Sequence, residues 1–272
     1  MKFFCYYLVF AICLDLSAQN KTLNAQASLF KTLKIKEYAV YETIMLGDSV
    51  VQKKYLSELV KLNPDGTVAE EYDYNPEGNL EGFISQYEYK NGNLVRQTMQ
   101  WIEQQERDII EYEYQNGLLV KQKEYEAGIL VGWHQYQYDK KKNIIRQQYF
   151  ASDGKPDTSV RYHYQNGLLV QQIRLNEMGE IIFSSVKEYS KQGWLLKEII
   201  QEGKKGEQTQ IVQTYTYDKQ GKLLKNVQQN LAGNPIFEVD FQYDSKGLLQ
   251  KVTFYDHMTT LFTIEEYEYH YL

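Results

Sequence analysis

Polar and apolar residues alternate along many short segments of this chain. In residues 237–243, Phe237, Val239 and Phe241 share one parity with Tyr243, and the residues between them are polar. Residues 110–114 and 211–217 repeat the pattern. Side chains two residues apart lie on the same face of a β-strand. The alternation therefore predicts strands with one apolar face and one polar face.

Most of these strands end in a pair of tyrosines that flank one polar residue. The second tyrosine falls at Tyr74, Tyr89, Tyr114, Tyr138, Tyr164, Tyr217 and Tyr269, and Tyr189 and Tyr243 hold the same position after Lys187 and Phe241. After a shorter first step these positions recur about every 25 residues, a period typical of a repeat architecture. We expect the paired tyrosines to fill the core. The polar residues between them should form outward ladders, among them Asp73, Glu88, Glu113, Gln137, His163 and Gln242.

Turn signals follow the tyrosines in two forms. Asn-Gly pairs at 91–92, 116–117 and 166–167 predict two-residue type I′ hairpins. A glycine four residues after the tyrosine, at Gly78, Gly193, Gly221 and Gly247, predicts a longer loop with glycine in the left-handed region. The fourth unit has Lys142-Asn143 there, and we expect Asn143 to take that conformation.

A second set of turn signals lies between these hairpins, including Asp65-Gly66, Ala127-Gly128, Asp153-Gly154, Met178-Gly179 and Ala232-Gly233. Each repeat thus supplies two antiparallel strands joined by short connections. The second strand of each repeat alternates less clearly, so the sequence does not decide which of its two faces is buried. The predicted fold is all-β: an antiparallel β-hairpin repeat array of about 25 residues per repeat, as a coiled or single-layer meandering sheet.

Residues 1–18 are predicted to be a secretory signal peptide, because Lys2 precedes an apolar stretch and small residues precede a cut at Gln19. Cys5 and Cys13 both lie inside it, so the mature chain has no thiol for a disulfide or a metal. No lipid anchor is expected. Residues 19–57, with weaker periodicity, are predicted to be an atypical N-terminal cap, and residues 58–272 the hairpin repeats.

The net charge of −6 and the absence of a basic stripe disfavour a nucleic-acid partner. The segments Tyr217-Asp218-Lys219-Gln220-Gly221 and Tyr243-Asp244-Ser245-Lys246-Gly247 resemble the YD repeat of RHS-type bacterial proteins, and 74–80 is similar. The resemblance covers roughly residues 60–272. It implies a long, spiralling β-sheet in an exported or surface-associated protein.

No motif for a familiar enzyme class is present in the sequence. His134, His163, His257 and His270 lack ligand spacing, so no metal site is predicted. The abundant carboxylates leave a glycosidase-like pair open, but those beside the tyrosines match a solvated strand face. We therefore expect no enzyme, no catalytic residue and no cofactor.

The aromatic residues are the better functional candidates. Trp101, Trp133 and Trp194 could stack on a sugar ring or anchor a protein partner, since indole offers a large flat area and a polar edge. The alternative is that they fill the core.

Three functions compete. The first is an exported, non-enzymatic repeat scaffold, periplasmic, on the cell surface or extracellular, that presents an extended surface to a glycan or protein partner at the cell envelope. The second is an outer-membrane β-barrel: residues 267–272 resemble the closing strand of such barrels, and sixteen to eighteen strands would suit a porin-sized wall. The third is a glycan-active hydrolase.

Overall fold

The computed structural model describes residues 16–103, 106–203 and 209–272, and these form one helix and eighteen strands. The helix is α2 (Leu16–Leu33). The strands are β1 (Ile35–Leu46), β2 (Ser49–Leu62), β3 (Val68–Tyr74), β4 (Leu80–Lys90), β5 (Asn93–Trp101), β6 (Arg107–Gln115), β7 (Leu118–Glu126), β8 (Ile129–Tyr138), β9 (Ile144–Ala151), β10 (Pro156–Gln165), β11 (Leu168–Leu175), β12 (Ile181–Tyr189), β13 (Leu195–Glu202), β14 (Thr209–Tyr217), β15 (Leu223–Gln229), β16 (Pro235–Tyr243), β17 (Leu249–Asp256) and β18 (Leu261–Tyr271).

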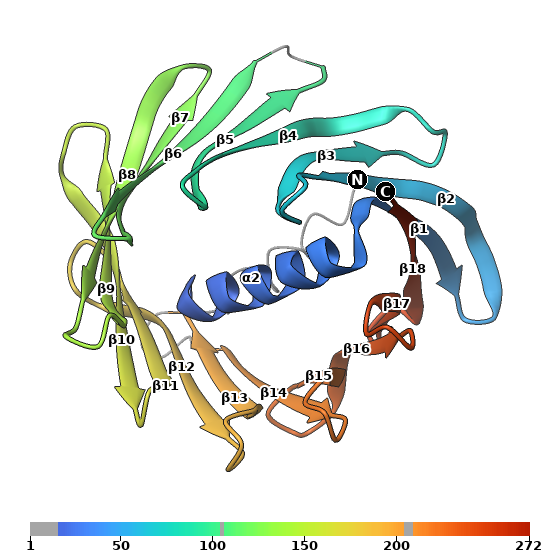
Figure 1. Cartoon of the computed structure of the whole chain (residues 1–272). Coiled ribbons are helices and arrows are strands. Elements are labelled where there is room, and N and C mark those ends of the chain that lie inside the picture. The colour runs from blue at the N-terminus through green and yellow to red at the C-terminus, as the bar shows by residue number, and fades with distance from the viewer. Residues whose placement is uncertain (1–15, 104–105, 204–208) are drawn as a thin grey trace.

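The sheet closes on itself. Each strand pairs in antiparallel fashion with the next one along the chain, and β18 pairs with β1 from Ile35↔Tyr271 to Leu46↔Leu261. Figure 1 shows the resulting ring. The prediction of an all-β hairpin meander is confirmed, but the prediction of an open or coiled sheet is wrong. Closure leaves no unpaired edge among the described strands.

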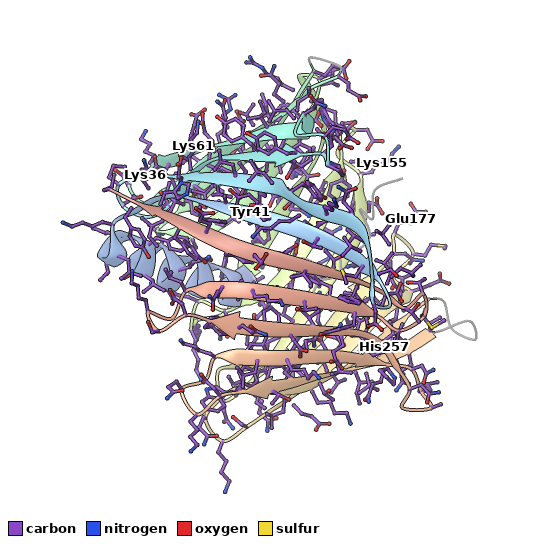
Figure 2. The ribbon with its side chains drawn as sticks, turned by 90° about the vertical axis from the view of Figure 1, so that its right-hand side faces the viewer. Lys36, Tyr41, Lys61, Lys155, Glu177 and His257 are labelled. Carbon is purple, nitrogen blue, oxygen red and sulfur yellow. The ribbon has the colours of Figure 1, made fainter. Side chains whose placement is uncertain are left out.

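Two sets of turns form the two rims of the barrel. The tyrosine rim contains the turns that follow even-numbered strands, together with the start of β1 and the end of β18. The second rim contains the turns that follow odd-numbered strands. Figure 2 shows Lys36 and Lys61 near the tyrosine rim, and Lys155, Glu177 and His257 near the second rim.

The helix α2 lies inside the ring of strands and fixes which face of each strand is the inner wall (Figure 1). Its Phe30 packs against Tyr38 and Tyr269, with ring centroids 5.7 and 6.1 Å apart, so both tyrosines face the lumen. Partners across an antiparallel ladder share a face, and successive residues alternate. The pairing register therefore places the tyrosine pairs from β4 onward on the inner wall.

The turns match the sequence signals closely. In the Asn-Gly hairpins both central residues have positive φ, for example 52° at Asn116 and 74° at Gly117. In the longer turns the glycine has positive φ, such as 88° at Gly221, as predicted. The prediction for Asn143 is wrong, because Lys142 takes the left-handed conformation with φ 67°.

The aspartate that follows the tyrosine has a local role in these longer turns. Asp218 Oδ1 accepts hydrogen bonds from the backbone N–H groups of Gln220 and Lys222, at 2.8 and 2.9 Å. Asn75 and Ser190 hold their turns in the same way. Satisfying these N–H groups from a side chain favours the turn before any tertiary contact forms.

The second tyrosine of several pairs fastens one hairpin to the preceding one. The hydroxyl groups of Tyr138, Tyr189 and Tyr269 donate to the backbone oxygens of Leu119, Leu169 and Leu249, at 2.6 to 2.8 Å. Each acceptor belongs to the hairpin that precedes the tyrosine in the chain. The period of the repeat therefore reproduces one inter-hairpin hydrogen bond along the wall.

The pair Tyr72 and Tyr74 is not equivalent to the others. It ends β3, whose turn belongs to the second rim, and Tyr72 pairs with Leu59 and Ile84 on the outer wall. This placement explains why the step from Tyr74 to Tyr89 is shorter than the rest. It also corrects the prediction for Asp73, which pairs with Glu58 on the inner wall instead of facing outward.

Candidate functional site

The inner wall carries a polar belt that accompanies the tyrosines. The Tyr136 hydroxyl donates to Gln122 Oε1 at 3.0 Å, and the Tyr162 hydroxyl donates to Gln147 Oε1 at 2.9 Å. Gln97, Gln122, Gln147 and Gln172 occupy equivalent inward positions on alternate strands. They recur once in each repeat, so this regularity of the sequence could have identified the inward face of the second strands.

These inward side chains pack sideways against each other along the concave wall. Gln172, Gln213, Asn226 and Gln228 are all buried, although they face the lumen. Hydrogen bonding compensates the desolvation of such polar groups. The tyrosines thus belong to a packed inner lining, but this lining surrounds a lumen instead of filling a solid core.

The lumen wall is strongly acidic. The ladder places ten carboxylates on it, in Glu42, Glu58, Glu71, Asp73, Asp108, Glu124, Glu198, Glu202, Asp256 and Glu265. Among the ladder partners of the described strands, Arg174 and Lys187 are the arginine and the lysine on this wall. Carboxylates therefore outnumber basic side chains among the ladder partners of this wall. An excess of one charge along a channel wall attracts mobile ions of the opposite sign.

One ion pair of the lumen wall is almost inaccessible to solvent. Lys187 of β12 and Glu198 of β13 are ladder partners, and their side chains are 3% and 1% exposed. The Lys187 ammonium donates a hydrogen bond to Glu198 Oε1. Each charge compensates the desolvation of the other, so losing either partner is costly.

The C-terminal end of α2 is fixed at the tyrosine rim. Phe30, Ile35 and Leu248 form a buried cluster there. The turn between β2 and β3 touches the helix so closely that a Cβ atom on Gly66 would overlap the backbone oxygen of Ala27. Glycine is thus required at this turn by space as well as by its φ of +84°.

The outer wall has two tiers. From the tyrosine rim to the middle of the strands, oppositely charged residues are ladder partners, as in Lys197 with Glu188 and Arg96 with Glu111. The Arg96–Glu111 pair is 3.2 Å apart, and the charges of this tier are half-exposed. His163 and His270 belong to the same face. We call this band the ion-paired tier.

Closer to the second rim the outer wall carries apolar and aromatic ladder pairs, with polar pairs such as Ser184↔Gln201 and Gln100↔Arg107 between them. Ladder partners here include Ile109↔Tyr125, Trp133↔Phe150, Val186↔Ile199, Ile199↔Val212 and Tyr255↔Phe262. The Trp133 and Phe150 rings stack with centroids 5.4 Å apart. Tyr41, labelled in Figure 2, belongs to the same outer face. We call this band the apolar tier.

The three candidate tryptophans lie in three different places. Trp101 ends β5 on the inner wall near the second rim, where its Nε1 donates to Asp108 Oδ2 at 2.6 Å. Trp133 is on the outer wall under the Lys121 ammonium, and Trp194 packs on Tyr217 and Gly221 at the tyrosine rim. The structure does not bring them together, and their role in ligand stacking stays a prediction.

The described residues include no group of three or more His, Cys, Asp or Glu that could hold a metal ion. His134 lies on the inner wall with its Nε2 3.2 Å from Glu124, and His270 pairs with Glu37 at 2.9 Å. Within the same residues, no helix is long and apolar enough to cross a membrane. The predicted signal peptide falls largely on residues 1–15, which lie outside the described residues, and stays a prediction.

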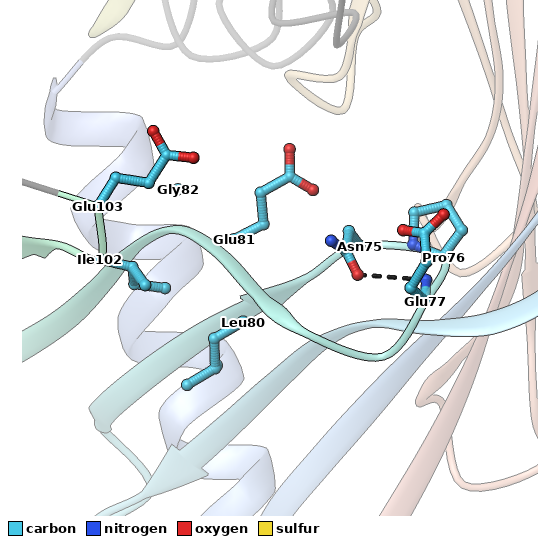
Figure 3. Close-up of a pocket in the computed structure, with 8 residues that line it drawn as sticks. All are labelled: Asn75, Pro76, Glu77, Leu80, Glu81, Gly82, Ile102 and Glu103. Carbon is cyan, nitrogen blue, oxygen red and sulfur yellow. Dashed lines mark hydrogen bonds between the residues drawn. The ribbon is translucent and has the colours of Figure 1, made fainter.

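A shallow pocket opens at the second rim between the β3–β4 turn and the end of β5 (Figure 3). Glu77, Glu81 and Glu103 line it beside Leu80 and Ile102. The Asn75 side chain accepts a hydrogen bond from the Glu77 N–H at 3.2 Å. That bond shapes the turn, and the pocket adds acidic surface to the rim.

No protein-family model matches the chain, and neither does any curated protein. Among solved structures, a porin-like protein from Bacteroides uniformis is similar at 10% identity with a TM-score of 0.44, over 87% of this chain and 98% of that one. A porin-like protein from Bacteroides vulgatus gives 10% identity and a TM-score of 0.39 over 88% of this chain and 99% of that one. The Photorhabdus luminescens Tc holotoxin pore is similar at 12% identity with a TM-score of 0.31, over 79% of this chain and 17% of that one.

At these TM-scores the similarities carry no argument about function. The closed eighteen-strand barrel itself corrects two predictions. The RHS-type resemblance is wrong, because a sheet that returns to its first strand is not a spiralling repeat sheet. The repeat scaffold with an extended binding surface is wrong for the same reason, since the tyrosine face encloses a lumen. The strand number agrees with the outer-membrane barrel alternative.

Proposed function

We propose that this protein is an outer-membrane-type β-barrel of the cell envelope whose acidic lumen is a passage for small hydrophilic solutes, with cations favoured over anions. The closed eighteen-strand sheet with a polar inner wall carries this proposal. Barrels that cross membranes are even-numbered and antiparallel, with polar interiors. Closure also satisfies the backbone hydrogen bonds without water.

The apolar tier supports a membrane location, because it gives the barrel an outward band of aromatic and aliphatic side chains. The ion-paired tier begins at the tyrosine rim, toward one membrane interface, where a charge on the lipid face costs least. Export by the predicted signal peptide would deliver the chain to the envelope. We assign no catalytic residue and no cofactor, so the non-enzymatic role stays a prediction, as does a glycan or protein partner.

The test is ion conduction by the purified, exported protein in planar bilayers of neutral lipid under a gradient of KCl. We expect discrete conductance steps and a reversal potential displaced toward the K⁺ equilibrium value. The lumen substitutions Glu124→Gln and Glu265→Gln together should move the reversal potential toward zero. Glu113→Gln and Glu266→Gln, on the outer wall, are the matched control and should leave it unchanged. Absence of conductance would contradict the passage.

A second candidate is a barrel that stands in water inside the envelope, with the lumen as a closed compartment. The ion-paired tier favours it, because the Arg96–Glu111 bridge lies in the middle of its strands and not only at the rim. A charge at the bilayer midplane costs about 2–4 kcal/mol on the lipid face of a barrel. Release of the native protein from envelopes by salt alone would support this candidate, whereas a requirement for detergent supports the membrane barrel.

A further inference from the structure

The two rims of the barrel differ sharply in polarity. The turns of the second rim expose large hydrophobic tips: Ile129 is 71% exposed, Met178 69%, Leu231 71% and Met258 76%. Leu46, Val50, Val51, Leu80 and Ile181 extend the same rim. Single exposed apolar residues are common on protein surfaces, but here they recur at several turns of one rim.

The turns of the tyrosine rim, all of which fall within the described residues, lack such tips. They contain Lys140, Lys141, Lys191 and Lys219, with Asn-Gly pairs between them. The exposed aliphatic residues beside these turns, Ile145, Leu196 and Leu224, stand one position inside the strands and are 38–42% exposed. Apart from Leu272 at the end of β18, which is 79% exposed, the barrel therefore has one apolar end and one basic, hydrophilic end.

We propose that the second rim is the end of the barrel that enters a bilayer of zwitterionic lipid. This inference rests on the proposed membrane location and adds its orientation. The apolar tips surround the mouth of the barrel as separate points instead of forming one patch. A protein partner would need a separate pocket for each tip, whereas a lipid layer accommodates every tip at once.

Two further observations favour this occupant. Apolar ladder pairs such as Trp133↔Phe150 and Tyr255↔Phe262 lie on the outer wall close to the same rim, so they add to the surface that a lipid layer would cover. Within the described part of this rim, the turns contain Asp48, Glu77, Asp153 and Glu177 but one lysine, Lys155, which disfavours an anionic headgroup. Charge repulsion of this kind weakens binding to anionic membranes.

The test is co-sedimentation of the purified protein with phosphatidylcholine vesicles. The fourfold variant Ile129→Ser, Met178→Ser, Leu231→Ser and Met258→Ser should lower the partition coefficient at least about tenfold. The matched control is Ile145→Ser, Leu196→Ser and Leu224→Ser on the tyrosine rim, which should change it less than about twofold. Replacing a third of the lipid with phosphatidylglycerol should weaken binding of the unmodified protein.

Equal binding by the rim variant and the unmodified protein would overturn the inference, and so would an equal loss in the control. Circular dichroism verifies folding, and if the fourfold variant does not fold, Ile129→Ser and Met258→Ser are measured singly with the same expected direction. Conductance separates the two proposals. A rim variant that still conducts and still binds vesicles refutes the orientation alone, while an unmodified protein that neither conducts nor binds refutes the membrane barrel.

Discussion

At the scale of single residues, the tyrosine that closes each pair gains its importance from its hydroxyl group. In Tyr138, Tyr189 and Tyr269 that group reaches back to a carbonyl of the preceding hairpin. The first tyrosine of a pair donates to a polar side chain instead, as Tyr162 does to Gln147 and Tyr267 does to Glu265. Phenylalanine would fill the same space but would leave these acceptors unpaired, which explains why the repeat uses tyrosine.

The first prediction tests this hydrogen bond. Tyr189→Phe should lower the free energy of unfolding by about 1 kcal/mol, because the Leu169 carbonyl loses its donor in a partly buried place. The matched control is Tyr217→Phe, since Tyr217 holds the equivalent position but contacts Trp194 through its ring. Urea denaturation measures both. Equal effects of the two substitutions would show that the hydroxyl of Tyr189 is not the stabilising group.

The wall, inner or outer, on which most side chains lie could be predicted from the sequence, because the alternation of polar and apolar residues along a strand is local information. Glu88, Glu113, Gln137, His163 and Gln242 do lie on the outer wall. The prediction that Asp73 faces outward is wrong because the ladder register of β3 with β2 decides its face. Asp73 follows the same local pattern, but β3 runs toward the second rim, and its neighbours, not its own sequence, decide its face.

At the scale of elements, two turns of similar sequence and backbone closure differ in whether they touch the helix. Both turns close with a hydrogen bond from the glycine N–H to the backbone oxygen of the asparagine three residues earlier, at 2.9 Å. They are Asn63-Pro64-Asp65-Gly66 and Asn75-Pro76-Glu77-Gly78. Gly66 touches α2, whereas a Cβ on Gly78 would have no atom within 4 Å. Comparing the two turns therefore separates two contributions to the free energy of unfolding: the backbone strain of replacing glycine and the displacement of the helix.

The second prediction uses this pair. Gly78→Val should cost about 1–2 kcal/mol, since a β-branched residue resists positive φ. Gly66→Val should cost at least about 2 kcal/mol more, because it also disrupts the buried packing of Phe30. Thermal unfolding measures the difference, and limited trypsin digestion should cut at Lys31 faster in the Gly66 variant only. Equal melting temperatures would refute the contact between this turn and α2.

The third prediction concerns the β8–β9 turn. The Asn143 side chain, the largest cause, and backbone N–H groups hydrogen-bond to Asp139 and lower its pKa. A carboxyl with a lowered folded pKa adds stability above its ordinary pKa and loses it as the pH falls through the folded value. Asp139→Asn should therefore lower the melting temperature at pH 6, by an amount that shrinks toward pH 3. A difference that stays constant with pH would contradict this role.

The hairpins could be predicted because their signals are short-range, as Asn116-Gly117 illustrates. The position of α2 could not be, because Phe30 finds its partners both at nearby Tyr38 and at Tyr269, near the other end of the sequence. The inward positions of Gln97, Gln122, Gln147 and Gln172 could have been predicted from the sequence. These glutamines recur as regularly as the tyrosines do. A glutamine in a strand is nevertheless expected to be solvated until it is known which face of the strand points into the lumen.

At the scale of the whole molecule, the decisive feature is the pairing of the first strand with the last. Each hairpin specifies its own register, but the curvature and stagger that bring β18 back to β1 accumulate over all eighteen strands. No short segment contains that information, so an open array and a closed barrel fit the same local pattern. The lumen, its acidic wall and the two distinct rims all follow from closure.

The most direct test of the closed barrel is a disulfide between the first and last strands. Thr43 and Ile264 are ladder partners on the outer wall, and paired positions are close enough for a disulfide. In a Cys5→Ser, Cys13→Ser background, Thr43→Cys with Ile264→Cys should form an intrachain bond under mild oxidation in most molecules. Thr43→Cys with Val212→Cys, which places the second thiol on β14, should not. Equally poor cross-linking of the two pairs would contradict the closed barrel.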